Sequence, residues 1–151
     1  MLLTELLTPD RIRVPIVAQE KAGVLRELVR FLVQVSGGRE AEILAAVEER
    51  ESVLSTGIGL GIAIPHAKSS SIDSLALVCG RTAQPIPFEA LDGEPVRLVF
   101  LLVGPESAAG QHVKALSRIA RLVRRESVRD ALLAAATPEE FYRVIVEAEG
   151  R

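Results

Sequence analysis

Apolar residues recur at helical spacing in two segments near the start of the chain, residues 21–35 and residues 40–51. Spacing of three to four residues places such side chains on one face, so both segments are predicted to be amphipathic helices. Gly37-Gly38 ends the first helix, because glycine readily adopts the backbone conformation that terminates one. The predicted inward faces comprise Val24, Leu25, Leu28, Phe31, Leu32 and Val35, then Ile43, Leu44 and Val47.

The last third of the chain is also predicted to be helical. Residues 111–124 form a long helix, and residues 127–136 either continue it or restart it. A final helix begins at Thr137, which can cap it through its side chain, with Pro138 at the first helical position and Glu140 at the third.

The middle of the chain carries the predicted strands. Residues 11–17 alternate and contain Pro15, a pattern typical of an edge strand. Residues 74–80 and 95–103 are apolar strands, and the second is expected to be central because it is apolar on both faces. A short buried segment is predicted at residues 61–64, with turns at residues 84–87 and 91–95.

This order of elements predicts one α/β domain covering residues 1–151, with a mixed sheet of about five strands flanked by helices on both faces. The length suits a single core, and 48% hydrophobic with 25% charged residues is ordinary for a globular protein. One cysteine excludes an internal disulfide. The net charge of −2 gives no general attraction to nucleic acid or anionic lipid.

We expect a cytoplasmic protein without membrane insertion. The N-terminus lacks the basic start and apolar run of a signal peptide. The apolar stretch at residues 98–103 is far too short to span a bilayer.

Most of the candidate chemistry gathers between Arg50 and His66. Arg50 follows Ile43 and Val47 at helical spacing, so it is expected to point inward at the end of its helix, where its charge needs a partner. A salt bridge, a side chain extended to solvent, or a bound anion would each satisfy it.

Gly57, Gly59 and Gly61 alternate in the same segment. They match neither a dinucleotide fingerprint nor a P-loop. Alternating glycines can direct backbone N–H groups at an anion, or they can make a tight connection packed against the sheet. The sequence leaves both interpretations open.

The two histidines are His66, at the end of a buried run, and His112, on the inward face of a helix start. A neutral imidazole can act as a nucleophile, although either residue could instead be a structural histidine bonded to the backbone. Two histidines and one cysteine make a poor metal site, and Cys79 is expected to be a buried core residue.

The late helix also carries a stripe of basic residues: Lys114, Arg118, Arg121 and Arg125. Such a stripe is either a solvated face or a binding surface for an acidic or phosphorylated partner.

Three stretches between Arg50 and His66 together resemble the signature of the type-2 enzyme IIA domains of the bacterial phosphotransferase system. They are Arg50-Glu51, Ser55-Thr56-Gly57-Ile58-Gly59 and Gly61-Ile62-Ala63-Ile64-Pro65-His66. The type-2 domains form the fructose, mannitol and nitrogen-regulatory family. The likeness extends through residues 85–88, 91–96 and 98–122, nearly the whole chain.

The resemblance implies a mixed sheet flanked by helices, with His66 as the phosphorylated residue and Arg50 and His112 as its pocket partners. It implies an HPr-type phosphocarrier as donor and a cysteine of an enzyme IIB domain as acceptor. Histidine-to-histidine transfer needs alignment and charge compensation rather than a metal or cofactor, so none is expected.

Two hypotheses remain at this point. The chain is a phosphoryl carrier, or it is a regulatory module that docks to target proteins according to the phosphorylation of His66. A homodimer is left open.

Overall fold

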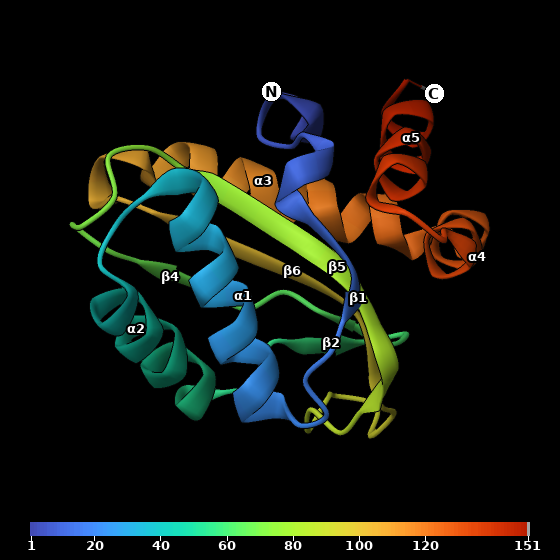
Figure 1. Ribbon diagram of the computed structural model, residues 1–151, viewed down its shortest axis with the longest axis horizontal. Helices are drawn as coiled ribbons and strands as arrows, with labels where there is room; N and C mark the ends of the chain where they lie inside the picture. Colours follow the sequence, from blue (N-terminus) through green and yellow to red (C-terminus); the bar gives the residue numbers. More distant parts are fainter. Residues whose placement is uncertain (151) are drawn as a thin grey trace.

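The computed structural model describes residues 1–150 and forms a single six-stranded sheet between two layers of helices (Figure 1). The strands are β1 (Ile12–Ile16), β2 (Gly57–Gly59), β3 (Ile62–Ala63), β4 (His66–Lys68), β5 (Ala76–Ile86) and β6 (Val96–Gly104). The helices are α1 (Lys21–Ser36), α2 (Glu40–Val53), α3 (Ala109–Arg124), α4 (Glu126–Ala134) and α5 (Pro138–Glu149). Short 3₁₀ turns occur at Leu3–Glu5, Pro9–Arg11 and Glu106–Ala108.

The sheet is mixed, as the sequence predicts. Its strand order is β1-β5-β6-β3-β2, with β4 also paired to β6. β1 runs parallel to β5, and β3 and β4 run parallel to β6, whereas β5 and β6 are antiparallel, as are β2 and β3. The apolar segment at residues 96–104 is therefore the central strand, and β1, with Pro15, lies at the sheet edge.

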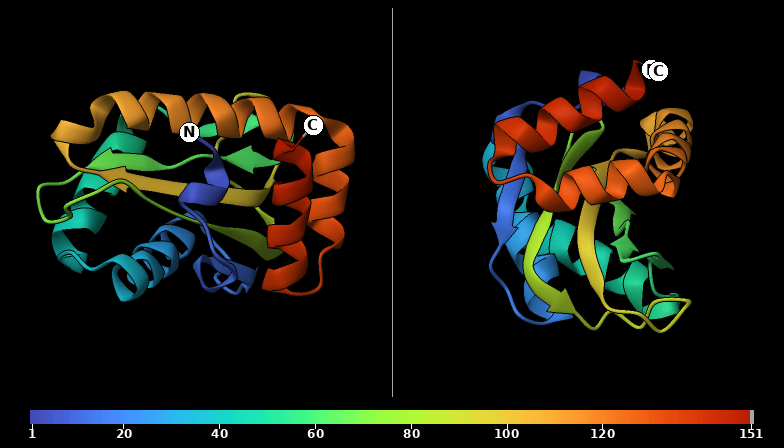
Figure 2. Two further views of the ribbon diagram at one scale, coloured as in Figure 1. Left: turned by 90° about the horizontal axis from the view of Figure 1, so that it is seen from above. Right: turned by 90° about the vertical axis from the view of Figure 1, so that its right-hand side faces the viewer.

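The two faces of the sheet bury separate cores. α1 and α2 cover one face, with Leu28, Ile43 and Leu101 among its buried residues. α3, α4 and α5 cover the other face around Phe100, Ile119 and Phe141. Figures 1 and 2 show this arrangement, with α3 running along the opposite side of the sheet from α1 and α2.

One predicted turn needs correction, and two other expectations become more definite. The turn predicted at residues 84–87 lies largely within β5, where Pro85 is tolerated because the register with β6 shifts between Arg81 and Ile86. α4 restarts rather than continues α3, because Arg125 adopts an extended conformation with ψ of 120°. The predicted mixed sheet of about five strands is confirmed: five strands form its main order, and His66–Lys68 pairs with β6 as a sixth.

Side-chain placement follows the predicted faces with a few exceptions. Phe31, Val35 and Leu44 are only half-buried. Cys79 is fully buried, and burial raises the pKa of its thiol, so it is the inert core residue that the sequence predicts. Thr137 accepts a hydrogen bond from the Glu140 backbone N–H at 3.1 Å, which confirms the predicted cap of α5. Within residues 1–150, no helix combines the length and apolarity that a membrane crossing requires.

Candidate functional site

His66 lies at the first position of β4, where the chain enters the sheet beside β6. Its backbone pairs with Leu102, and the neighbouring Pro65 carbonyl accepts the Leu102 N–H at 3.1 Å. Its ring Nδ1 lies 2.8 Å from the backbone carbonyl of Ile64. A carbonyl can only accept a hydrogen bond, so Nδ1 must carry the proton. A neutral ring with this hydrogen bond keeps its lone pair on Nε2, which leaves that atom available to bond an electrophile.

His112 lies in the first turns of α3 and faces inward, as predicted, with 4% of its surface exposed. Its ring meets the ring of His66 edge to face, with centroids 5.5 Å apart. Burial lowers the pKa of His112, and its electrostatic interactions with His66 and Lys68 lower it further, while the Glu106 carboxylate opposes them. His112 is therefore neutral near pH 7, and its buried Nδ1 has no hydrogen-bond partner among the described residues.

Arg50 occupies the last turn of α2 and is half-buried, which agrees with the inward direction predicted from helical spacing. Its Nη1 donates to the Leu54 carbonyl at 2.9 Å, just beyond the helix end. The ion pairs found among residues 1–150 do not include it. The guanidinium thus keeps its full charge and most of its donors for a ligand.

These three residues converge on one hollow of about 480 Å³ between α2, β4 and α3. Its lining consists of Ala46, Glu49, Arg50, Val53, His66, Ala67, Lys68 and His112. Arg50 and His112, which are 62 positions apart in the chain (112 − 50), therefore line the same hollow, because β4 places His66 between the end of α2 and the start of α3.

Lys68 is a site residue that sequence reasoning missed. It follows His66 by two positions on β4, so both side chains lie on the same face of the strand and line the same hollow. Its Nζ lies 3.3 Å from the exposed carboxylate of Glu106. The strand alternation would have revealed it, had His66–Lys68 been recognised as a strand.

The glycines serve a different purpose from the anion binding considered above. Leu60 and Gly61, with φ of 60° and 78°, make the two-residue turn between β2 and β3. The Gly57 amide donates to Ser55 Oγ and the Leu60 amide to Asp92, both at 3.0 Å. A side chain at Gly57 would come within 2.8 Å of the Ala90 Cβ. The tight-connection interpretation is confirmed, and the hollow is lined by none of these glycines.

The site combines an available imidazole nitrogen with two cations, Arg50 and Lys68, and a neutral second imidazole. This arrangement suits a group that carries negative charge while bonded to His66. Among residues 1–150, no three histidine, cysteine, aspartate or glutamate side chains come together as metal ligands.

Comparison with known proteins decides the family. The sequence model described as the phosphoenolpyruvate-dependent sugar phosphotransferase system, EIIA 2, matches residues 5–148. The chain belongs to this EIIA family.

Its relatives include both regulatory and sugar-specific EIIA proteins. A nitrogen regulatory protein of Bradyrhizobium diazoefficiens is 36% identical over 145 residues, 96% of this chain and 95% of that protein. The fructose-specific EIIABC component of Bacillus subtilis is 40% identical over 146 residues, 96% of this chain but only 23% of that protein. The chain thus resembles one segment of the longer EIIABC component.

The fold agrees with a solved structure of the same family. The crystal structure of the nitrogen regulatory protein IIA-Ntr from Neisseria meningitidis superposes with a TM-score of 0.89 and 31% identity, covering 95% of this chain and 98% of that one. The mixed sheet with helices on both faces is therefore an EIIA fold.

Proposed function

We propose that His66 is the phosphoryl-accepting residue of this EIIA domain and that Nε2 forms the bond to phosphorus. The hydrogen bond from Nδ1 to the Ile64 carbonyl carries this proposal, since it keeps the lone pair on Nε2. The donor is an HPr-type phosphohistidine. Its P–N bond breaks as the bond from Nε2 to phosphorus forms, and the donor imidazole leaves with the electron pair.

Arg50, Lys68 and His112 have separate roles around the transferred group. A phosphoryl group brings about −1.5 to −2 charges near neutral pH. The Arg50 guanidinium can bind two of its oxygens, and the Lys68 ammonium adds a second positive charge within the same hollow. His112, neutral and buried beside His66, can donate a hydrogen bond to a phosphoryl oxygen.

The rim of the hollow fits a protein as donor. Val53, which lines the hollow, is 80% exposed, and Leu54 and Val113, the sequence neighbours of Val53 and His112, are 60% and 66% exposed. Apolar side chains left in water around a polar site are typical of a surface that another protein covers. An HPr-type carrier seated there would bring its phosphohistidine to His66.

The acceptor defines two versions of this function. Similarity to the fructose-specific EIIABC component supports transfer to the cysteine of an enzyme IIB domain. Similarity to nitrogen regulatory proteins supports a switch whose docking to a target protein depends on phosphorylation of His66. Both use the same phosphorylated residue, and the cytoplasmic location expected from the sequence suits both.

Phosphorylation can be tested directly. The protein is incubated with phosphoenolpyruvate, enzyme I and an HPr-type carrier, and its mass is followed. We expect an acid-labile phosphoryl adduct that maps to His66 and is absent from His66→Ala. Incorporation that is unchanged in His66→Ala would refute the assignment.

The acceptor is tested with the phosphorylated protein. Transfer to a purified IIB domain, lost when its cysteine is replaced, would support the transport version. A change of affinity for a captured target between the phosphorylated and unphosphorylated forms, without onward transfer, would support the regulatory version.

A further inference from the structure

Glu51 is a buried carboxylate that follows Arg50 in α2 but does not line the hollow around His66. It accepts hydrogen bonds from the Thr56 backbone N–H at 2.9 Å and from the Thr56 hydroxyl at 2.5 Å. Its other contact is an ion pair with Lys21 Nζ at 2.9 Å. Lys21 also donates to the Phe88 carbonyl at 3.3 Å. One carboxylate therefore joins α1, α2 and the chain leading into β2.

Hydrogen bonds through the backbone of Thr56 and Ile64 link this carboxylate to His66. The Thr56 carbonyl accepts the Ile64 N–H at 3.0 Å. The Ile64 carbonyl in turn accepts from Nδ1 of His66 at 2.8 Å. Glu51 holds Thr56, and the Thr56 carbonyl holds the N–H of Ile64. The carbonyl of Ile64, in the next peptide group along the chain, sets the tautomer and the orientation of the His66 ring.

The same carboxylate controls the surroundings of Arg50. The guanidinium of Arg50 donates to the Leu54 carbonyl, which lies in the short connection between Glu51 and Thr56. The two hydrogen bonds from Thr56 to Glu51 hold the two ends of this connection together, and this fixes the position of the Leu54 carbonyl within it. Both the nucleophile and the main cation of the site thus depend on the position of Thr56.

We propose that Glu51 is a positioning residue for phosphoryl transfer, acting on His66 through Thr56 and Ile64 and on Arg50 through Leu54. The proposal rests on the proposed function of His66. A purely structural role does not explain why a charged residue occupies position 51, because burying an ion pair such as that of Lys21 and Glu51 brings little net stability. A role in holding the reacting atoms in fixed positions explains it better, since small displacements of those atoms slow a reaction strongly.

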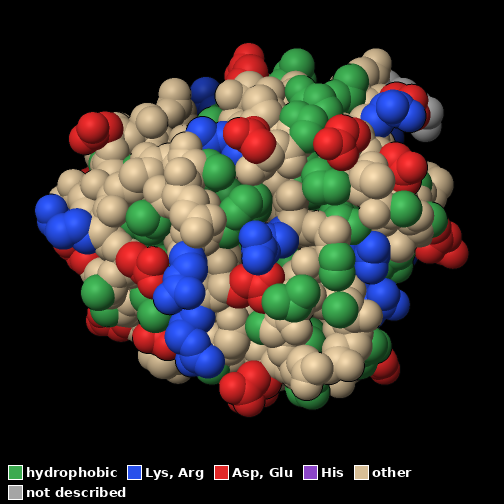
Figure 3. Space-filling model, viewed as in Figure 1, with side chains coloured by type: hydrophobic (Ala, Val, Ile, Leu, Met, Phe, Trp, Pro, Cys, Tyr) green, Lys and Arg blue, Asp and Glu red, His purple; other side chains and the backbone are tan. Residues whose placement is uncertain are grey.

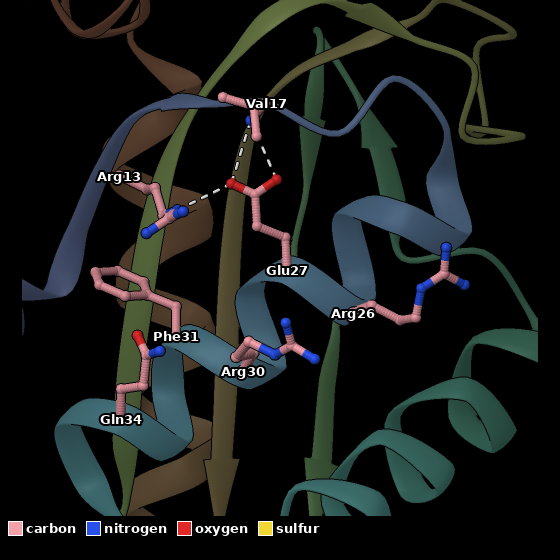
Figure 4. A pocket seen from close by; sticks show the side chains of 7 residues that line it. All are labelled: Arg13, Val17, Arg26, Glu27, Arg30, Phe31 and Gln34. Atoms are coloured by element: carbon pink, nitrogen blue, oxygen red, sulfur yellow. Dashed lines mark hydrogen bonds and ion pairs between the residues drawn. The ribbon is translucent and has the colours of Figure 1, made fainter.

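Glu27 offers a matched control on the same layer of helices. It is also a largely buried carboxylate that accepts a backbone N–H, from Ala18 at 2.8 Å, and pairs with an arginine, Arg13, at 2.9 Å. Figure 4 shows it between Arg13 and Val17, joining α1 to the end of β1. No histidine is visible on the side of the molecule shown in Figure 3, which is the side that α1 covers in Figure 1.

The experiment compares Glu51→Gln with Glu27→Gln in full-length protein. Both are expected to lower the melting temperature. Only Glu51→Gln should lower kcat for transfer from the HPr-type carrier, by roughly 10- to 100-fold, with the KM for the carrier unchanged. Glutamine cannot accept from both Thr56 donors as a carboxylate does, and it loses the ion pair to Lys21. Equal kcat values for Glu51→Gln and Glu27→Gln would overturn the proposal.

A second readout needs no phosphoryl transfer and so separates this proposal from the proposed function. Imidazole ¹⁵N shifts at mildly alkaline pH report which nitrogen of neutral His66 carries the proton. We expect Nδ1–H in the wild type and in Glu27→Gln, and an increased share of Nε2–H in Glu51→Gln. An unchanged tautomer in Glu51→Gln would refute the positioning role even if the protein were never phosphorylated.

Thr56→Val provides a second variant in case Glu51→Gln fails to fold. It removes only the hydroxyl donor and keeps the backbone bond to Glu51. Thr82→Val is its control, because Thr82 is also buried but bonds the Arg97 carbonyl away from the hollow. A lower kcat and a shifted His66 tautomer in Thr56→Val alone would support the proposal, and equal behaviour of the two valine variants would contradict it.

Discussion

The rings of His66 and His112 meet edge to face, with their planes at 69° and their centroids 5.5 Å apart. The two residues have different surroundings. His66 donates from Nδ1 to a backbone carbonyl and is only partly buried, whereas His112 is almost fully buried and its Nδ1 has no partner among residues 1–150. The partly accessible, oriented ring of His66 is suited to accept the phosphoryl group, and the enclosed ring of His112 is suited to assist.

His112→Ala tests this division of roles. The variant should still be phosphorylated at His66, because the nucleophile and its hydrogen bond to Ile64 remain. Onward transfer should be slower, since one hydrogen-bond donor to the phosphoryl group is lost. Peptide mapping of the phosphorylated wild type decides the matter: label on His112 itself would reverse the assignment.

Arg50→Lys keeps the positive charge but loses the planar pair of donors. We expect a normally folded protein whose transfer rate falls by about 100-fold, equivalent to about 3 kcal/mol. Single-turnover rates and melting temperatures should both be measured. A purely structural Arg50, holding only the Leu54 carbonyl, would give the opposite result: a lower melting temperature with an almost normal rate.

Lys68→Gln should slow phosphoryl transfer by roughly 5-fold, because the lysine is partly exposed and its charge is partly screened. Added salt should narrow the difference from the wild type. Lys114→Gln removes an exposed lysine of α3 that lies outside the hollow, and it should have no such effect. Equal rates for Lys68→Gln and the wild type at low salt would exclude Lys68 from the site.

The lowered pKa of His112 makes stability depend on pH. Desolvation in the folded state disfavours its protonated form, so the pKa lies below the value of about 6.5 expected for the unfolded chain. As pH falls through about 6.5, the unfolded chain binds a proton that the folded protein resists, and stability is lost until the folded pKa is reached. The melting temperature of the wild type should therefore fall more between neutral and mildly acidic pH than that of His112→Gln. Parallel curves would contradict this account.

Much of the architecture follows from local patterns. Helical spacing predicts α1 and α2, and the capping residues at Thr137 and Pro138 predict the start of α5. A strand that is apolar on both faces must be covered on both, and this property identifies β6 as central. The direction of Arg50 and His112 toward the protein interior also follows from helical phase alone.

The assembly of the site depends on contacts between distant segments. Lys68 joins it because β4 pairs with β6, and a three-residue strand has too short a pattern to be recognised without its partner. The glycines form a hairpin turn rather than an anion cradle, because Asp92 and Ala90 from a distant loop pack against them. The tautomer of His66 is likewise set by the Ile64 carbonyl, whose position depends on Thr56 and thus on the end of α2. Residue spacing predicts which way a side chain points from its own element, but only the packing of elements places its reactive atoms beside their partners.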